Sequence, residues 1–334
     1  MPVVWSDQCR LHQPLAEIWL GTRMPATEVP ERIEAIRAAL DARVVPAEPH
    51  GDDALLAVHD AALVEYLEGA WREWEAAGLE QDRVVPYVFA HEALGVRKPP
   101  AAVWAKPGLF AYDTMTLIGP GTWEAARAAV DVALTAVDLV RGAEPAAYAC
   151  CRPPGHHVTR RGYGGSCYLN NAAVAAKAFG GRVAVVDIDA HHGNGTQEIF
   201  WDDPSVLVGS VHVDPGAGWF PHFLGFPDET GVDGSNRNLV VAPGSGDAEW
   251  LEAVRELAGW ARDAEAIVVS LGVDAAEGDP ESPLRVTAAG FREAGRIVGA
   301  LGRPTVLVQE GGYDLATIGP LVREVLLGFE EARS

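Results

Sequence analysis

The sequence predicts an α/β fold built on a central parallel sheet with helices on both faces. Short β-branched runs alternate with helical stretches in the second half of the 334-residue chain, and this alternation is typical of parallel sheets. The hydrophobic fraction of 48% is enough for a sizeable buried core. Polar clusters with glycine or proline follow the ends of several predicted strands. We therefore expect a ligand site beyond the carboxyl edge of the sheet.

The expected strands are short and apolar, and the expected helices lie between them. We expect strands over 146–151, 182–188, 206–212, 238–241, 266–271 and 305–309. We expect helices over 122–140, 169–179, 195–201, 247–262, 287–301 and 315–328. In the last of these, apolar residues recur every three or four positions, as a helix with one buried face requires.

A segment rich in proline and aromatic residues, from residue 78 to 107, breaks this pattern. A disordered linker would rarely be so aromatic. A long ordered loop in a compact domain is often functional, as a lid, a wall or a contact surface. The alternative is a surface loop that packs only against its own domain. The length of the chain allows one large α/β domain or two small ones.

The chain carries a net charge of −21. Such a surface repels nucleic acid phosphate and favours a cationic substrate over an anionic one. The alternative is an acidic surface that only keeps the protein soluble. We expect no nucleic acid partner.

The sequence also predicts a cytoplasmic protein without a membrane anchor. The longest helical candidate, 122–140, is interrupted by four charged residues and is too polar to span a bilayer. The first ten residues lack a basic stretch followed by an apolar one, so we expect no signal peptide. Cys9, Cys150, Cys151 and Cys167 show no CxxC spacing, which indicates reduced thiols.

Polar clusters follow five of the predicted strands. They are CRPPGHH (151–157), DIDAHH (187–192), SVH (210–212), GVDAAEGDPE (272–281) and EGGYDL (310–315). One such cluster could be accidental. Because the carboxyl ends of parallel strands share one edge of the sheet, five of them predict a single site.

The cluster after the second of these strands predicts a metal site. Asp187, Asp189 and His191 have the same parity, so a continued strand would present them on one face. Asp189 and His191 could bind one ion together with Asp274 from another strand end. Three protein ligands and an open position are typical of a catalytic zinc, although iron(II), cobalt(II) or manganese(II) would also suit these ligands. The alternative is that the aspartates cap a helix and the histidines form core hydrogen bonds.

Two further clusters carry groups suited to proton transfer and to oxyanion binding. His156 and His157 follow a PPG turn from which both could reach one pocket, and histidine transfers protons near neutral pH. The alternative is a turn in which one histidine is merely buried. Tyr313 follows Gly311 and Gly312, and a tyrosine hydroxyl can donate to a developing oxyanion.

Taken together, these motifs resemble those of the histone deacetylase superfamily. The motifs are RPPGHH, GGSCYLNN (164–171), VDIDAHHGNG (186–195), GVDAAEGDP and EGGYDL, and PGTWEAA (120–126) is similar to the bacterial acetylpolyamine amidohydrolase branch. The resemblance implies the arginase–deacetylase fold, with a central parallel sheet of about eight strands. It implies one catalytic domain over 1–334 with a long loop insertion at about 78–110. It also implies a zinc amidohydrolase, with one zinc per subunit, that releases acetate from an acetylated amine.

The resemblance assigns a role to each matching residue. The zinc ligands are Asp189, His191 and Asp274, and the catalytic residues are His156, His157, Tyr313, Asp187 and Asn194. A structural potassium site is implied at Asp187, Asp189, His191, Ser210 and Val211. Substrate binding is implied at Gly165, Ser166, Phe220, Glu281 and Gly311.

A division of labour between the two histidines follows from the residues behind them. The resemblance places the Asp187 carboxylate behind His156 and the neutral Asn194 behind His157. A carboxylate favours the charged imidazolium more than an amide does. We therefore expect His157 to be the neutral base that takes the proton of water, with Tyr313 binding the oxyanion.

Two positions bear on the substrate. Ser166 stands where the family usually has a phenylalanine that forms one tunnel wall, and Tyr163 is the nearest aromatic that could fill the gap. Glu281 lies seven residues after Asp274, where the mammalian polyamine deacetylase has a glutamate that selects cationic chains. A carboxylate there would pair with the distal ammonium of an acetylated polyamine. The alternative is an exposed loop acid.

The resemblance leaves several readings of the whole protein. The leading one is deacetylation of acetylpolyamines or similar small amines by a homodimer joined through the long loop. The alternatives are a protein acetyl-lysine deacetylase, an arginase-like enzyme with two manganese ions, and an inactive regulator that binds acetylated groups. Asn194 stands where the arginase pattern requires an aspartate, which disfavours the second alternative.

Overall fold

A computed structural model describes residues 1–95 and 98–334. Eight parallel strands form the central sheet in the order β4-β1-β5-β10-β9-β6-β7-β8. The strands are β1 Val3–Trp5, β4 Val44–Pro46, β5 Ala146–Ala149, β6 Val183–Asp187, β7 Val206–Val213, β8 Asn236–Val241, β9 Ala266–Leu271 and β10 Thr305–Gln309. The predicted parallel sheet is confirmed.

The register of the sheet brings the polar clusters to one edge. Asp187 at the end of β6 pairs with Ser210 of β7 and with Ser270 of β9. On the next strand, Gln309 of β10 pairs with Leu271 of β9. The residues that follow β6, β9 and β10 therefore leave the sheet at the same level. These three strands are buried along their whole length, as parallel strands covered on both faces are.

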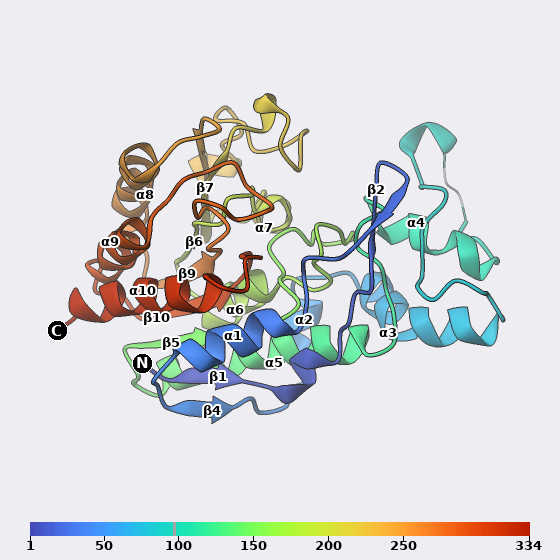
Figure 1. Cartoon of the computed structure of the whole chain (residues 1–334), viewed down its shortest axis with the longest axis horizontal. Helices are drawn as coiled ribbons and strands as arrows, with labels where there is room; N and C mark the ends of the chain where they lie inside the picture. The colour runs from blue at the N-terminus through green and yellow to red at the C-terminus, as the bar shows by residue number, and fades with distance from the viewer. Residues whose placement is uncertain (96–97) are drawn as a thin grey trace.

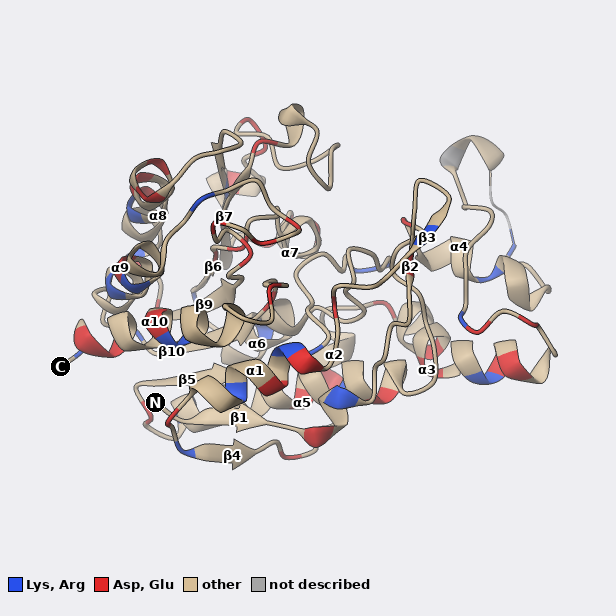
Figure 2. Ribbon diagram, in the orientation of Figure 1, with Lys and Arg blue, Asp and Glu red and all other residues tan. Residues whose placement is uncertain are grey.

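Helices cover the sheet (Figure 1). They are α1 Glu31–Ala39, α2 Asp53–Leu56, α3 Ala61–Ala76, α4 Pro107–Phe110, α5 Thr122–Arg141, α6 Asn171–Phe179, α7 Asn194–Phe200, α8 Asp247–Ala261, α9 Ala288–Gly299 and α10 Ile318–Glu331. The six helices that the sequence predicts correspond to α5 to α10, with ends that differ by up to three residues. Many charged residues lie on these outer helices and in loops (Figure 2). No helix within residues 1–95 and 98–334 has the length and apolar character to cross a membrane.

The long segment predicted at about 78–110 lies at one end of the molecule, beside α3 (Figure 1). It contains two 3-10 turns, Glu92–Leu94 and Val103–Ala105, and ends in α4. Tyr87 and Trp104 in this segment are 69% and 48% exposed. Close to it, β2 (Glu17–Trp19) and β3 (Thr22–Met24) form an antiparallel hairpin outside the main sheet.

Candidate active site

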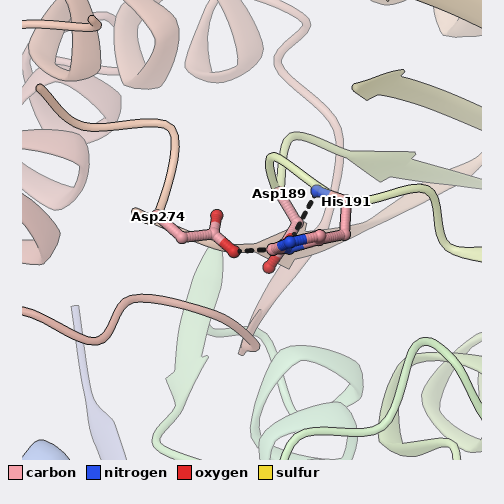
Figure 3. Close-up of side chains that lie close together, drawn as sticks. All are labelled: Asp189, His191 and Asp274. Carbon is pink, nitrogen blue, oxygen red and sulfur yellow. Dashed lines mark hydrogen bonds and ion pairs between the residues drawn. The ribbon is translucent and has the colours of Figure 1, made fainter. Parts of the chain in front are cut away.

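The three predicted metal ligands converge above the ends of β6 and β9. One ligand atom from each of Asp189, His191 and Asp274 lies within 4.8 Å of the others, and the side chains point toward one another (Figure 3). His191 Nδ1 lies 3.2 Å from Asp189 Oδ1 and 3.0 Å from Asp274 Oδ2. The sequence analysis paired Asp189 with His191 by assuming that the strand continues, but β6 ends at Asp187, so the segment after the strand brings them together. The parallel pairing of β6 with β9 brings Asp274 to them.

Backbone groups hold each of these side chains in place. The Gly311 N–H donates to Asp189 Oδ2 at 2.8 Å, and the Ala190 N–H donates to Asp274 Oδ1 at 2.9 Å. The Nε2–H of His191 donates to the carbonyl oxygen of Glu281 at 3.1 Å. This bond leaves Nδ1 of His191 facing the two carboxylates, in the orientation that a metal-binding imidazole needs.

The charges of this cluster favour a bound cation. Burial, together with the charge of Asp189, raises the pKa of Asp274 to about 7. Burial opposes the charge on His191, but its hydrogen bonds with Asp189 and Asp274 outweigh burial and raise its pKa well above the ordinary value. The carboxylates of Asp189 and Asp274 therefore stabilise a positive charge at the place where they meet His191. Imidazole and carboxylate ligands suit zinc, so the donor set fits a divalent metal.

The tandem histidines occupy the turn after β5, and their partners differ. Nδ1 of His156 lies 2.9 Å from Asp187 Oδ2, and Nδ1 of His157 lies 2.7 Å from Asn194 Oδ1. Burial opposes the charged form of His156, but Asp189 and Asp187 outweigh it and raise its pKa to about 10. Burial and the positive charges of His156 and His191 hold the pKa of His157 well below the ordinary value. The surroundings therefore favour the charged form of His156 and the neutral form of His157.

Glu310 holds the histidine turn, a function that the sequence analysis missed although the residue lies in the EGGYDL motif. Its side chain is fully buried. Its Oε2 accepts hydrogen bonds from the N–H groups of Gly155 at 2.7 Å and of His156 at 3.2 Å. Burial raises the pKa of this carboxyl to about 7.

Tyr313 lines the same cavity as His157 and is held in place by Asp279 and Arg32. Its N–H donates to Asp279 Oδ2 at 2.8 Å. The guanidinium of Arg32 lies 4.7 Å from the centre of the Tyr313 ring and donates to the Gly312 carbonyl at 2.6 Å. Burial raises the pKa of the Tyr313 hydroxyl well above its ordinary value, so this hydroxyl stays protonated and can donate.

A cavity of about 80 Å³ joins these groups to the surface. Its lining consists of Glu17, Thr27, Met115, His157, Gly165, Ser166, His191, Phe220, Glu281 and Tyr313. The sequence analysis named seven of these ten residues and missed Glu17, Thr27 and Met115. These three come from the first 115 residues, where the sequence showed no motif to single them out.

Phe220 forms an aromatic wall of the cavity, whereas Ser166 leaves the other side without one. Tyr163 does not fill this gap, so that expectation is wrong. It is fully buried and stacks between Tyr66 and Tyr168. Tyr112 instead lies near the site, with its ring nearly parallel to Phe220 at 6.4 Å.

The proposed potassium residues lie on β6 and β7 and just beyond β6. Asp187 and Ser210 are register partners, and Val211 follows on the same strand. The hydroxyl of Ser210 lies 2.8 Å from Nδ1 of His212. The potassium site stays a prediction.

Comparison with known proteins places this geometry in a family. The model of the histone deacetylase domain matches residues 26–329. The chain belongs to the histone deacetylase family. It is 39% identical to acetylpolyamine amidohydrolase 1 of Pseudomonas aeruginosa over 98% of this chain and 99% of that protein. It is 38% identical to the acetylpolyamine amidohydrolase of Mycoplana ramosa, over 98% and 99% respectively.

A solved structure agrees with these sequence matches. The fold superposes on acetylpolyamine aminohydrolase from Burkholderia pseudomallei with a TM-score of 0.93, at 38% identity, and covers 99% of each chain. The arginase–deacetylase fold and the family that the motifs predicted are thereby confirmed.

Gly311 leaves room for the side chains of the metal ligands. A Cβ atom at this position would lie 2.3 Å from Asp274 Oδ2 and 2.5 Å from Asp189 Oδ2. If these residues bind a divalent metal, we expect Gly311→Ala to push the ligands apart and to weaken zinc binding at least about tenfold, as changes beside metal ligands typically do. Competition with a chromophoric chelator measures the affinity. Gly259→Ala is the control, because a Cβ there meets nothing within 4 Å; equal zinc affinity in the two variants would contradict the prediction.

Proposed function

We propose that this protein is a metal-dependent amidohydrolase that removes acetyl groups from acetylated polyamines or similar small cationic amines. The convergence of Asp189, His191 and Asp274 carries this proposal, together with a cavity that His191 lines along with His157 and Tyr313. The two relatives above, both named acetylpolyamine amidohydrolases and matched over nearly their whole length, support the choice of amine.

Each residue of the site has its own role in the proposed hydrolysis of the acetyl amide. Asp189, His191 and Asp274 would hold a zinc ion, which when bound polarises the acetyl carbonyl and activates water. His157, neutral and hydrogen-bonded to Asn194, takes the proton of the attacking water and delivers one to the leaving amine. Tyr313 donates its O–H to the developing oxyanion. His156 pairs with Asp187 and contributes charge stabilisation rather than proton transfer.

The mouth of the cavity favours a thin cationic substrate. Glu281 supplies a carboxylate in the cavity lining, and a carboxylate stabilises an ammonium at short range. Gly165, Ser166 and Phe220 also line this cavity, and the Gly311 N–H donates to the metal ligand Asp189. An acetylated amine chain would enter between these groups with its cationic end toward Glu281.

The remaining features of the proposal concern the whole molecule. We infer one catalytic domain, a structural potassium ion between the ends of β6 and β7, and a cytoplasmic protein whose four cysteines are all buried free thiols.

We also infer a homodimer joined through residues 78–110, because exposed aromatic side chains gather there and such patches mark interfaces. Light scattering at micromolar concentration tests the dimer, and a monomer would contradict it.

A substrate panel tests the proposed activity. Zinc-reconstituted protein is assayed for acetate release from acetylputrescine, acetylcadaverine and an acetyl-lysine peptide at equal enzyme concentration. We expect the two small amines to have kcat/KM at least about tenfold above the peptide, which corresponds to one additional charge-assisted contact. A higher value for the peptide would instead assign the chain as a protein deacetylase. Binding of acetylated amines without acetate release would indicate an inactive regulator.

A further inference from the structure

Glu28 is a buried carboxylate outside the residues that line the active-site cavity. It belongs to the segment before α1, and only 1% of its surface is exposed. Burying a charged side chain costs much free energy unless groups of opposite charge surround it. The partners of Glu28 therefore indicate what this carboxylate does.

Two guanidinium groups share one oxygen of Glu28. Nη1 of Arg32 donates to Glu28 Oε1 at 2.8 Å, and Nε of Arg152 lies 2.8 Å from the same oxygen. Both arginines are buried as well. Burial opposes the charge of Glu28, but Arg152 and Arg32 outweigh burial and hold the pKa of Glu28 below the ordinary value. Glu28 thus supplies a negative charge to both guanidinium groups.

The remaining nitrogens of Arg32 hold the loop that carries Tyr313. Its Nε–H donates to the carbonyl oxygen of Gly312 at 2.6 Å, and its Nη2 donates to the carbonyl oxygen of Glu310 at 2.6 Å. The guanidinium carbon lies 4.7 Å from the centre of the Tyr313 ring, which is within the range of a cation–π contact. Every nitrogen of this guanidinium is therefore engaged, and the group is fixed in relation to the Tyr313 ring.

Arg152 anchors Glu28 itself. Its Nη1 donates to the carbonyl oxygen of Cys9 at 2.8 Å, and its Nη2 donates to the backbone carbonyl of Glu28 at 3.3 Å. These contacts join the turn after β5 to the N-terminal segment. Of the two arginines, Arg32 is therefore the one that links the carboxylate to a catalytic side chain, through its contact with the Tyr313 ring.

We propose that Glu28 is a positioning residue for Tyr313: its carboxylate orients the Arg32 guanidinium, which fixes the Tyr313 loop so that the hydroxyl can donate to the developing oxyanion. This inference rests on the proposed amidohydrolase function and deepens it, because it adds a carboxylate that touches no substrate. A buried guanidinium without a counter-charge is costly. Without Glu28, Arg32 would turn toward other acceptors and leave the loop less fixed.

A double-mutant cycle tests this role. Glu28→Gln keeps the size and the Oε1 acceptor of the side chain and removes its charge. In zinc-reconstituted protein we expect kcat for N-acetylputrescine to fall about tenfold, with KM changed less than about threefold, because the Tyr313 hydroxyl acts on charge that develops in the transition state. In the Tyr313→Phe background the same substitution should lower kcat less than about twofold, since the hydroxyl is already absent. A tenfold loss in both backgrounds would overturn the proposal.

Hydrogen–deuterium exchange measures the loop independently of turnover. We expect the amides of residues 310–314 to exchange at least about fivefold faster in Glu28→Gln than in the parent protein. Asp131→Asn is the control, because it breaks an ion pair of the same i, i+4 spacing, with Arg127, away from the cavity. This control should leave both kcat and the exchange of residues 310–314 unchanged.

The outcomes separate this inference from the proposed function. If Glu28→Gln does not fold, the cycle is repeated with Glu28→Asp, which keeps the charge on a shorter side chain; its smaller loss in kcat should also disappear in the Tyr313→Phe background. If the parent protein is active but Glu28→Gln keeps the parent's kcat and exchange rates, the positioning role fails while the proposed function stands. If the parent releases no acetate, the proposed function fails, and the exchange rates alone decide whether Glu28 holds the loop.

Discussion

Replacing His157 by alanine is expected to lower kcat for acetyl release by about 10²–10⁴, the usual contribution of a general base. Its Nδ1 is held by the neutral Asn194 side chain, and its pKa is held well below the ordinary value by burial and by the charges of His156 and His191. The imidazole is therefore unprotonated at neutral pH and can accept a proton from water. Steady-state kinetics with N-acetylputrescine measure the loss.

His156→Ala is the matched comparison, since it removes the neighbouring imidazole. His156 stays protonated beside Asp187 and Asp189, so it contributes charge rather than proton transfer, and we expect a loss at least about tenfold smaller than for His157→Ala. Zinc content should be measured for both variants, because both histidines lie close to the metal ligands. If His156→Ala abolished turnover while His157→Ala retained most of it, the assignment of roles would be wrong.

Tyr313→Phe is expected to lower kcat by about 10²–10³, the cost of removing one oxyanion donor. The phenylalanine ring keeps the contact with the Arg32 guanidinium, so the loop should stay in place and only the O–H is lost. KM should change little, because the hydroxyl acts on charge that develops in the transition state. Tyr66→Phe, at a tyrosine outside the cavity lining, is the control. A Tyr313→Phe variant within about twofold of the parent in kcat would contradict the role.

The strands that the sequence analysis predicted are those long enough to show a recognisable apolar run. Strands β5 to β10 each contain four to eight residues, and apolar runs of this length are recognisable. The three-residue strands β1 and β4 were missed. They are too short for any period to appear, and their place at one side of the sheet depends on tertiary contacts. Helices α1 to α4 were missed together with them.

In the candidate site, too, some residues could be predicted from local sequence and others depend on tertiary contacts. Asp189 and His191 could be placed together because both closely follow a single strand, although the strand ends at Asp187 and parity does not extend to them. Asp274 required either a parallel sheet or the family resemblance, because 83 residues separate it from His191. Glu17 and Thr27 could not be found in this way. The hairpin that carries Glu17 lies outside the main sheet, and how it packs against the cavity is fixed by three-dimensional contacts, which leave no trace in local spacing.

The place of β10 in the sheet has a consequence for biosynthesis. This strand is the last of the chain, yet it lies between β5 and β9 near the middle of the sheet. The residues that follow it include Gly311 and Tyr313, so a nascent chain still on the ribosome has an open sheet and an incomplete centre. Exposed strand edges of this kind invite aggregation. Synthesis of β10 and of the residues that follow it should therefore both close the sheet and complete the centre.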